Sequence, residues 1–297
     1  MANGLVSASP RGLIARSVTA AADALSPRSR NLQGLLFSLP LILLFLAFVV
    51  YPLYFEVTQA LDRYTYEVLF NDPIYVQTVV NTLVYVGIAV NLKLFLALLL
   101  SGLLDDDSRS TRFLSAIFLL PWAIPVLPGI LSVRWMMSSQ WGILNLITED
   151  LGLGTHHWLA SRWTAMTALI LFHIWKYLPF WTVILLAARR GIPRQLYEAA
   201  AIDGAGTLQT FRYVSVPLLA GIYLIFSLLS MGFTMGDVTN VWLMTGGAPG
   251  DSTHVLATLA YRYTFAMGRL EWGLSTFAVA LPVTLLFIGM LMRWVKI

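Results

Sequence analysis

Hydrophobic residues form six long runs along the chain, and shorter polar segments separate them. The runs cover residues 35–55, 78–104, 113–135, 164–188, 216–235 and 274–294. A helix needs about 20 apolar residues to cross a hydrocarbon core, whereas a barrel strand is an alternating segment of about 10 residues. The pattern therefore predicts an all-α polytopic membrane protein with six transmembrane helices.

The composition supports this prediction, because 58% of the 297 residues are hydrophobic, only 11% are charged, and the mean hydropathy is +0.74. Soluble domains usually carry about 25% charged residues. The chain contains no cysteine, which excludes disulfides and thiolate metal sites. His156 and His157 are adjacent, a poor arrangement for a metal pair on a helix, so no metal site is expected.

The positive charges predict the orientation in the membrane. Six spans place both termini on one side, and the Lys and Arg residues on that side number twelve, against five on the other. By the positive-inside rule both termini are cytoplasmic, with residues 1–34 as an N-terminal tail and residues 35–297 as the membrane domain. The first run is too long for a signal peptide and lacks its cleavage pattern. The basic pI of 9.4 follows from this asymmetry, so no nucleic acid partner is expected.

Motifs for catalysis and nucleotide binding are missing from the sequence. It contains no G-x-x-x-x-G-K-[ST], no H-E-x-x-H and no G-x-S-x-G. We therefore expect neither catalytic residues nor a cofactor in this chain. If ATP drives its activity, a partner subunit must bind the ATP and Mg²⁺.

One polar block, EAAAIDGAGTLQTFRYVSVPLL at residues 198–219, stands between two strongly hydrophobic runs. An alanine-rich helix is predicted from Pro193 onwards, and Gly204 ends it. Thr207 is expected to cap a second short helix. Such a helical hairpin is either an amphipathic element lying on the membrane or a docking element for a soluble partner.

The order of residues in this block resembles the EAA loop of ABC importer permeases. In that family E-A-A-x-x-x-G is followed, nine residues later, by I-x-L-P. Here Val214 and Val216 replace the Ile and the Leu. The resemblance implies that the loop, about residues 189–216, is a cytoplasmic coupling element that docks on an ATPase subunit. Its implied contact residues are Glu198, Ala199, Ala200, Asp203 and Gly204.

The resemblance covers nearly everything from residue 35 onwards, through stretches such as LPLILLFLAFVVYPLYF, WGILN and TGGAP. These stretches are similar to carbohydrate-importer permeases of the MalF/UgpA type, which have the MetI-like fold. The chain lacks the extra N-terminal spans and the large insertion of maltose MalF. Its short form also resembles the first permease of actinobacterial trehalose importers. The resemblance implies a bacterial plasma-membrane subunit that imports a disaccharide such as trehalose. Its implied partners are a MalG-type permease, two ABC ATPases and an extracytoplasmic sugar-binding protein.

Two spans carry polar and aromatic residues at helical spacing, and polar residues within a membrane usually face a bundle interior or a cavity. Related permeases line their solute site with the corresponding faces, so we expect a sugar path there. Lys176 has an alternative structural role, pairing with Asp237 or reaching an interface, and Lys93 is interpreted as structural. Trp122, between two prolines, predicts a kink in the third span. The expected path residues are His173, Lys176, Tyr177 and Phe180 in the fourth span, and Ser230, Phe233, Thr234 and Asp237 in the fifth.

The outer loop from about residue 238 to 269 contains TGGAPGDSTH, which predicts a flexible segment. The resemblance implies that Thr245, Gly246, Gly247 and Pro249 contact the binding protein, and a passive linker is the alternative. For the whole chain, the alternative function is a secondary transporter driven by an ion gradient. Such a transporter would be expected to place more carboxylates within its spans than Asp237 alone.

Overall fold

The computed structural model describes residues 27–60, 62–106 and 108–294. Every regular element within these ranges is helical. The chain divides into two compact units, Met1–Thr58 and Gln59–Ile297, which are described separately below.

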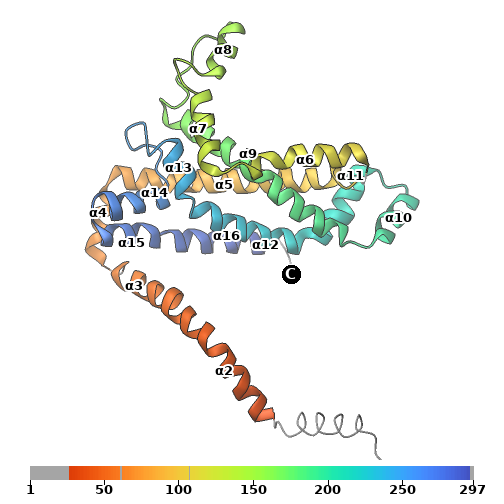
Figure 1. Ribbon diagram of the computed structural model, residues 1–297, viewed down its shortest axis with the longest axis horizontal. Coiled ribbons are helices and arrows are strands. Elements are labelled where there is room, and N and C mark those ends of the chain that lie inside the picture. Colours follow the sequence, from red (N-terminus) through yellow and green to blue (C-terminus); the bar gives the residue numbers. More distant parts are fainter. Residues whose placement is uncertain (1–26, 61, 107, 295–297) are drawn as a thin grey trace, which may run out of the picture. The chain divides into compact units, whose positions relative to one another are not determined.

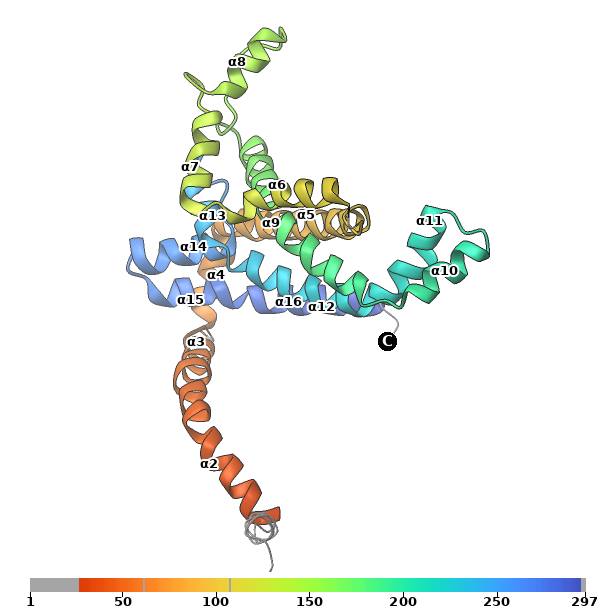
Figure 2. The same ribbon diagram turned by 45° about the vertical axis from the view of Figure 1, so that its right-hand side comes forward.

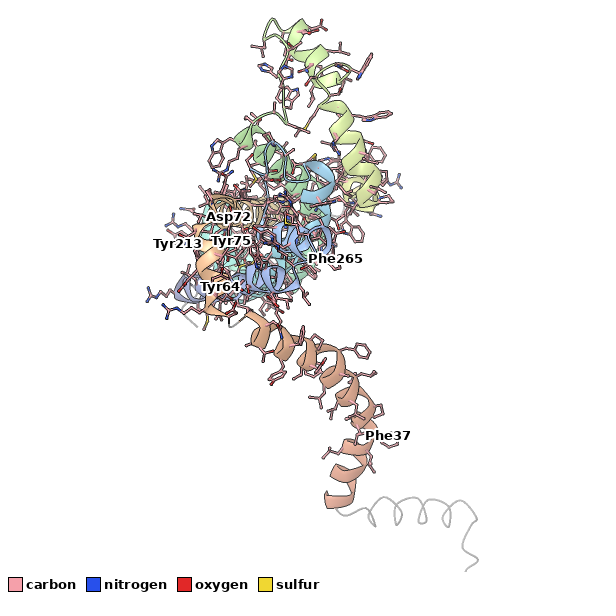
Figure 3. The ribbon with its side chains drawn as sticks, turned by 90° about the vertical axis from the view of Figure 1, so that its left-hand side faces the viewer. Phe37, Tyr64, Asp72, Tyr75, Tyr213 and Phe265 are labelled. Carbon is pink, nitrogen blue, oxygen red and sulfur yellow. The ribbon has the colours of Figure 1, made fainter. Side chains whose placement is uncertain are left out.

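The first unit contains one long apolar helix, except for its last two residues, which belong to the second unit. It consists of α2 (Pro27–Phe45), the π-helical segment η1 (Leu46–Val50) and α3 (Tyr51–Ala60). The part long and apolar enough to cross a membrane is Gly34–Ala60, which confirms the first predicted span. Its apolar side chains are exposed from Leu35 to Val57, and Phe37 is 87% exposed (Figure 3). The helix begins earlier than predicted, and residues 1–26 of the expected tail lie outside the described residues.

The second unit is a helical bundle built on α5 (Pro73–Leu103) and α9 (Arg162–Arg190), which share its most extensive interface. The helices α6 (Arg109–Ala123) and α12 (Val216–Met235) pack on this pair, and α16 (Ala280–Trp294) packs on α12 (Figure 1). Apolar side chains at the centre, including Tyr85, Leu94, Leu169 and Leu185, are fully buried. The predicted second, fourth and fifth spans are confirmed as α5, α9 and α12.

The predicted third span is two helices, α6 and α7 (Val126–Met136), which meet at an angle of 92°. The bend lies between Pro121 and Pro125, where sequence reasoning placed a kink. Pro125 cannot donate a backbone N–H, and it disfavours helical geometry at Ile124. The structure thus has five helices long and apolar enough to span a membrane, or six with this broken pair. Beyond α7, the chain continues to α8 (Ile143–Asp150), away from the bundle (Figure 2).

Short elements gather at both ends of the bundle (Figures 1 and 2). One end carries α10 (Arg194–Ile202), α11 (Thr207–Thr210) and the π-helical η2 (Phe211–Ser215). We call residues 191–215 the hairpin. Its second arm continues directly into the bundle, because α11, η2 and α12 form one helix, Thr207–Met235. The other end carries α4 (Arg63–Asn71), α13 (Val238–Met244), α14 (Leu256–Tyr261) and η3 (Arg262–Ala266). The last span begins at that end with α15 (Leu270–Ala278), which leads into α16.

The start of α5 is fixed by Asp72, which is labelled in Figure 3. Its carboxylate accepts the backbone N–H of Ile74 at 2.9 Å and the hydroxyl of Tyr263 at 3.2 Å. Pro73 follows at the first helical position, where a missing N–H is harmless. Burial, and then the charge of Asp72, raise the pKa of Tyr263 to about 12, so its hydroxyl remains a donor.

We expect Asp72→Ala to lower the free energy of unfolding by about 1 kcal/mol, the usual contribution of a helix N-cap. Asp72→Asn should retain most of this stability, because an asparagine oxygen can accept the same backbone N–H. The measurement is the melting temperature of the purified protein in detergent. Equal melting temperatures for the Ala and Asn variants would contradict the capping role.

Candidate functional site

A buried polar cluster lies where α5, α9, α12 and α13 meet. Its members share a network of hydrogen bonds, and all are buried except Asp237, whose side chain is 10% exposed. The cluster consists of Tyr85, Lys93, His173, Thr234, Asp237 and Asn240. Buried polar side chains require such partners, because an unpaired one costs free energy in a medium without water.

His173 is the centre of this cluster. Its Nε2 lies 2.8 Å from the Nζ of Lys93, and its Nδ1 lies 3.3 Å from the Oδ2 of Asp237. An ammonium group can only donate, so we assign Nε2 as the acceptor and Nδ1 as the protonated nitrogen. The imidazole thus joins a cation on α5 to a carboxylate at the end of α12. A buried charge on either residue is thereby compensated within the bundle.

Asp237 also begins α13. Its carboxylate accepts the backbone N–H of Asn240 at 3.1 Å and the hydroxyl of Tyr85 at 3.1 Å. The side chain of Asn240 in turn donates to the hydroxyl of Tyr177 at 3.2 Å. One carboxylate therefore fixes the direction in which the chain leaves the fifth span.

The proposed pairing of Lys176 with Asp237 is wrong. Lys176 is buried, and its ammonium group donates to the carbonyl oxygens of Pro121 at 2.8 Å, Trp122 at 3.0 Å and Ile124. These carbonyls lie at the end of α6, where the broken span leaves backbone acceptors without helical partners. The three N–H groups of Lys176 are all used in this way, which is the structural role that the sequence left open.

The remaining expected path residues fall into two environments. Ser230 and Thr234 are buried, and Thr234 lies 3.3 Å from Nε2 of His173. Phe233 is 72% exposed, although helical spacing places it beside them. Tyr177 and Phe180 are half-buried, and the ring of Phe180 stacks on that of Trp122 at 5.6 Å. The structure therefore joins His173, Tyr177, Thr234 and Asp237 in one network. The side chains of Lys176, Phe180, Ser230 and Phe233 lie outside it.

Sequence reasoning missed Tyr85, Lys93 and Asn240 as members of this cluster. Lys93 was judged by its neighbour Asn91, whose side chain donates to the carbonyl of Gly87 instead. A signal was available, because Tyr85 and Lys93 are eight residues apart and so lie on one stripe of a helix. The partners on other helices could not be found from spacing within one helix.

The hairpin exposes the residues of the E-A-A-x-x-x-G motif. Glu198, Ala199 and Asp203 are exposed, and Ala200 is half-buried. Gly204 has a φ of +78°, a conformation that favours glycine, and nothing lies within 4 Å of the position of an added Cβ. The hairpin also exposes four large apolar side chains, namely Leu196, Ile202, Leu208 and Tyr213.

One detail of the predicted hairpin is wrong. Thr207 is the first residue of α11, and Gly206 is its N-cap. The backbone N–H of Gly206 donates to the side-chain oxygen of Gln209 at 2.9 Å, so the Gln209 side chain reaches back to the cap residue. The capping signal therefore came from Gln209, three residues after the cap.

The glycine-rich outer segment is ordered, contrary to the predicted flexibility. Asn81 of α5 donates to the carbonyls of Ser252 and His254, at 2.8 Å in both cases. His254 is fully buried, and a Cβ on Gly247 would lie 2.2 Å from its ring. Of the remaining expected contact residues, Thr245 and Pro249 are half-buried and Gly246 is exposed. The segment is thus held on the bundle and presents a defined surface.

Three ionisable groups face one another within this segment. The guanidinium of Arg262 pairs with Asp251, and Nε2 of His254 lies 3.5 Å from the Asp251 carboxylate and 3.4 Å from Arg262. The hydrogen bond from Arg262 lowers the pKa of Asp251. Burial lowers the pKa of His254 and outweighs the attraction of Asp251. Both groups therefore bind fewer protons in the folded segment than they would in an unfolded one.

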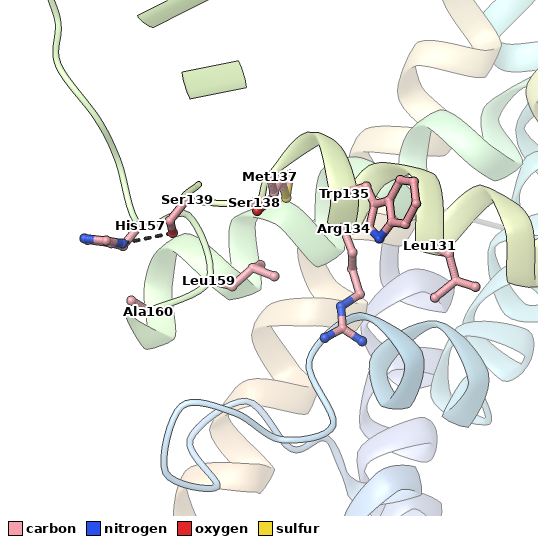
Figure 4. A pocket seen from close by; sticks show the side chains of 9 residues that line it. All are labelled: Leu131, Arg134, Trp135, Met137, Ser138, Ser139, His157, Leu159 and Ala160. Atoms are coloured by element: carbon pink, nitrogen blue, oxygen red, sulfur yellow. Dashed lines mark hydrogen bonds between the residues drawn. The ribbon is translucent and has the colours of Figure 1, made fainter. Parts of the chain in front are cut away.

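A cavity of about 620 Å³ opens beside α7 (Figure 4). Its polar groups include Arg134, which donates to the carbonyl of Leu243 at 3.0 Å, and His157, whose Nδ1 lies 2.9 Å from the Ser139 hydroxyl. These side chains come from α7 and from the two segments that flank α8. Among the described residues, no three His, Asp or Glu side chains are grouped closely enough to hold a metal ion.

We expect Lys176→Met to destabilise the broken span, because it leaves three carbonyl groups unpaired and each costs about 1–3 kcal/mol. Lys176→Arg keeps a cation with several donors and should lose less stability. The measurements are the melting temperature and the hydrogen exchange of residues 120–127 in detergent. Wild-type values for Lys176→Met would contradict this role.

We expect acid to loosen the outer segment. A group whose pKa is lowered by folding stabilises the folded segment fully at a pH above its ordinary pKa, which is 6.5 for His254. This stabilisation is lost as the pH falls towards the folded-state pKa. The stabilisation from Asp251 is lost in the same way below its ordinary pKa of 3.8. Hydrogen exchange of residues 245–255, compared at about pH 7.5 and about pH 5.5, should show weaker protection at the lower pH. A His254→Gln variant should lose this difference, and an equal difference in both proteins would contradict it.

Comparison with known proteins places the whole bundle in one family. Residues 30–296 match the family described as binding-protein-dependent transport system inner membrane component. A probable ABC transporter permease of Pyrococcus horikoshii is 32% identical over 231 residues, which cover 77% of this chain and 79% of that protein. The trehalose/maltose transport system permease protein MalF of Thermococcus litoralis is 30% identical over 205 residues, or 68% and 69% of the two chains.

A solved structure confirms the fold. A chain from the crystal structure of a bacterial ABC transporter involved in the import of the acidic polysaccharide alginate superimposes with a TM-score of 0.79. The two chains are 21% identical, and the match covers 91% of this chain and 97% of the other. The fold is therefore MetI-like. The chain belongs to the family of binding-protein-dependent transport system inner membrane components, the permease subunits of ABC transporters.

Proposed function

We propose that this chain is the permease subunit of an ATP-driven, binding-protein-dependent importer for a sugar, and that it couples to a separate ATPase through the hairpin. The observation that carries this proposal is the exposed E-A-A-x-x-x-G motif on a short helical hairpin that continues into a membrane span. Glu198, Ala199 and Asp203 are exposed, and the space beside the Cα of Gly204 is open. The exposed apolar side chains of the hairpin fit a protein partner, since such patches usually mark an interface.

The charge distribution supports the proposed orientation. The hairpin and the ordered outer segment lie at opposite ends of the bundle (Figure 1). The end with the hairpin also carries Arg189, Arg190, Arg194 and Arg212. The positive-inside rule therefore favours a cytoplasmic hairpin, which a cytoplasmic ATPase could reach. The sequence has no phosphate-binding glycine-rich loop, so the proposed partners, two ABC ATPases, would bind ATP and Mg²⁺.

We place the sugar path on the exposed side of the polar cluster, between this chain and a second, MalG-type permease. Side chains buried within one subunit are used by that subunit, as the contacts of His173 and Lys176 illustrate. The stacked rings of Trp122 and Phe180 and the exposed ring of Phe233 remain available. Aromatic faces suit a sugar because its ring carries apolar C–H faces between its hydroxyls. The buried cluster would then hold the helices that present this surface.

The ordered outer segment is the proposed contact for an extracytoplasmic sugar-binding protein. Gly246 is exposed there, next to the half-buried Thr245 and Pro249, on a backbone fixed by Asn81. Little flexibility would be lost on binding, which favours recognition. The relative from Thermococcus litoralis is named for trehalose and maltose transport, and this supports a disaccharide such as trehalose as the solute.

Transport driven by an ion gradient has one observation in its favour, the buried contact of Lys93, His173 and Asp237. Ion-coupled transporters use such ionisable groups within the membrane. The two functions differ in their energy source. Uptake into cells that lack the ATPase gene, but retain this chain, would support the ion gradient, whereas its loss would support the ABC importer.

We expect Glu198→Lys and Gly204→Trp to reduce co-purification of the ATPase and sugar uptake together, because both alter the proposed docking surface. Gly152→Trp is the matched control, since Gly152 has a similar φ of +73° and an equally open surrounding. The strain of a tryptophan is therefore similar at the two positions. The measurements are the ATPase recovered with tagged permease from membranes and the uptake of labelled trehalose and maltose. Normal ATPase recovery for both hairpin variants would contradict the coupling proposal, regardless of which solute is transported.

A further inference from the structure

A buried arginine joins the hairpin to the bundle. Arg189 lies in the last turn of α9 and is 6% exposed. Its guanidinium donates from Nη1 to the Ser215 hydroxyl at 2.9 Å, from Nε to the Ser101 hydroxyl at 3.3 Å, and from Nη2 to the Leu98 carbonyl at 3.4 Å. Arg189 therefore connects three helical elements. It lies on α9 itself, Ser215 belongs to η2, and Ser101 and Leu98 belong to α5.

The contacts of this arginine extend to the first arm of the hairpin. The hydroxyl of Tyr197 on α10 lies 3.3 Å from the Ser215 hydroxyl. Ser215 is itself buried and accepts from Arg189, and either hydroxyl of the Tyr197–Ser215 pair can donate to the other. The path of hydrogen bonds runs from Tyr197 next to the E-A-A motif, through Ser215 and Arg189, to Ser101 on α5. We call these four residues the arginine junction.

The site around Arg189 is shaped for its guanidinium. A Cβ added to Gly102 would lie 3.3 Å from Nη2, so a larger residue at that position would press on the charged group. The ring of Phe211 lies 6.0 Å from Cζ on another side. The charge of this guanidinium is costly to bury at the end of a span, and its N–H groups, which point in fixed directions, hold it in place. Lysine could not reproduce this geometry, because its three N–H groups all extend from a single nitrogen atom.

The junction lies at an irregular point of the continuous helix from the hairpin to α12. Residues Phe211–Ser215 form a π-helical turn, in which the N–H of Val216 bonds to the carbonyl of Phe211. Such turns interrupt the regular ladder and are frequent at functional sites. Without a further connection, the helix could bend there, and motion of the hairpin would be absorbed. Arg189 bonds to the last residue of this turn.

We propose that Arg189 is the positioning residue that makes the hairpin and the adjacent end of α5 move as one body, so that a displacement of the hairpin reaches the membrane spans. This proposal rests on the proposed function, since an ATPase must move the hairpin. Arg189 acts through Ser215 and Ser101 and is too buried to touch the ATPase itself. Docking and transmission are therefore assigned to different residues, with Glu198 and Gly204 serving the first and Arg189 the second.

The proposal is tested by a distance between spin labels on the hairpin and on α5. Gln195→Cys at the start of α10 and Leu103→Cys at the end of α5 give two exposed sites, and the chain has no other cysteine. The labelled permease is measured in its complex with the sister permease and the ATPases, without and with ATP. With Arg189 present, we expect one narrow distance distribution that is the same in both states. In Arg189→Met it should widen and shift with ATP by about 5 Å, close to one helical turn.

Arg190→Met is the matched control, because Arg190 is the neighbouring arginine and pairs with Asp105 in a more exposed position. It should behave as the parent protein. Arg189→Lys is a milder second variant and should give an intermediate distribution. The proposal is overturned if Arg189→Met retains the narrow, ATP-independent distance, or if the parent distance itself shifts with ATP. Loss of ATPase binding in both Arg189 variants would also overturn it, because the arginine would then serve only to hold the fold.

Failure of this proposal can be told apart from failure of the proposed function. The docking test with Glu198→Lys and Gly204→Trp measures whether the hairpin binds an ATPase at all. The label distance measures whether α5 follows the hairpin once the ATPase is bound. A hairpin that docks but moves independently of α5 would leave the proposed function standing and remove only the role of Arg189.

Discussion

The structure depends on one constraint, that a polar group inside a hydrocarbon layer must find its partner within the protein. Lys176 meets this constraint by donating to three carbonyls at the break between α6 and α7. His173 meets it by joining Lys93 to Asp237. Arg189 meets it by donating to three oxygens, two on α5 and one on η2. Each of these side chains is buried and connects helices that are distant in the sequence. These three ionisable residues of the spans therefore act first as connections between helices.

These connections explain how the bundle tolerates irregular backbone. The 92° break would leave the carbonyls at the end of α6 unpaired, and Lys176 supplies the missing donors. The π-helical turn at Phe211–Ser215 is fixed in a similar way by Arg189, and the start of α13 by Asp237. A regular helix would need none of these side chains. These three irregular segments thus lie beside a cation or carboxylate that stabilises them.

The two ends of the bundle differ in a way that suits a permease subunit. The hairpin projects its motif and several apolar side chains away from the bundle, whereas the outer segment is held down by Asn81 and buries His254. On the proposed function, the first end receives a moving partner and the second offers a fixed surface to a binding protein. The solute surface between them would be formed by aromatic rings that the subunit does not use internally, such as Phe233.

The sequence alone determined the helical class, the positions of the spans, the break near Trp122 and the hairpin with its glycine turn. Run length, proline and glycine act locally, so they can be read from neighbouring residues. Helical spacing also grouped His173 with Tyr177, and Thr234 with Asp237. Only the tertiary structure decided that Lys176 binds the broken helix, that Lys93 and Tyr85 join His173, and that the glycine-rich outer segment is ordered. Those outcomes depend on which helices lie side by side, and a side chain's partner across a helix interface leaves no periodic signal in its own segment.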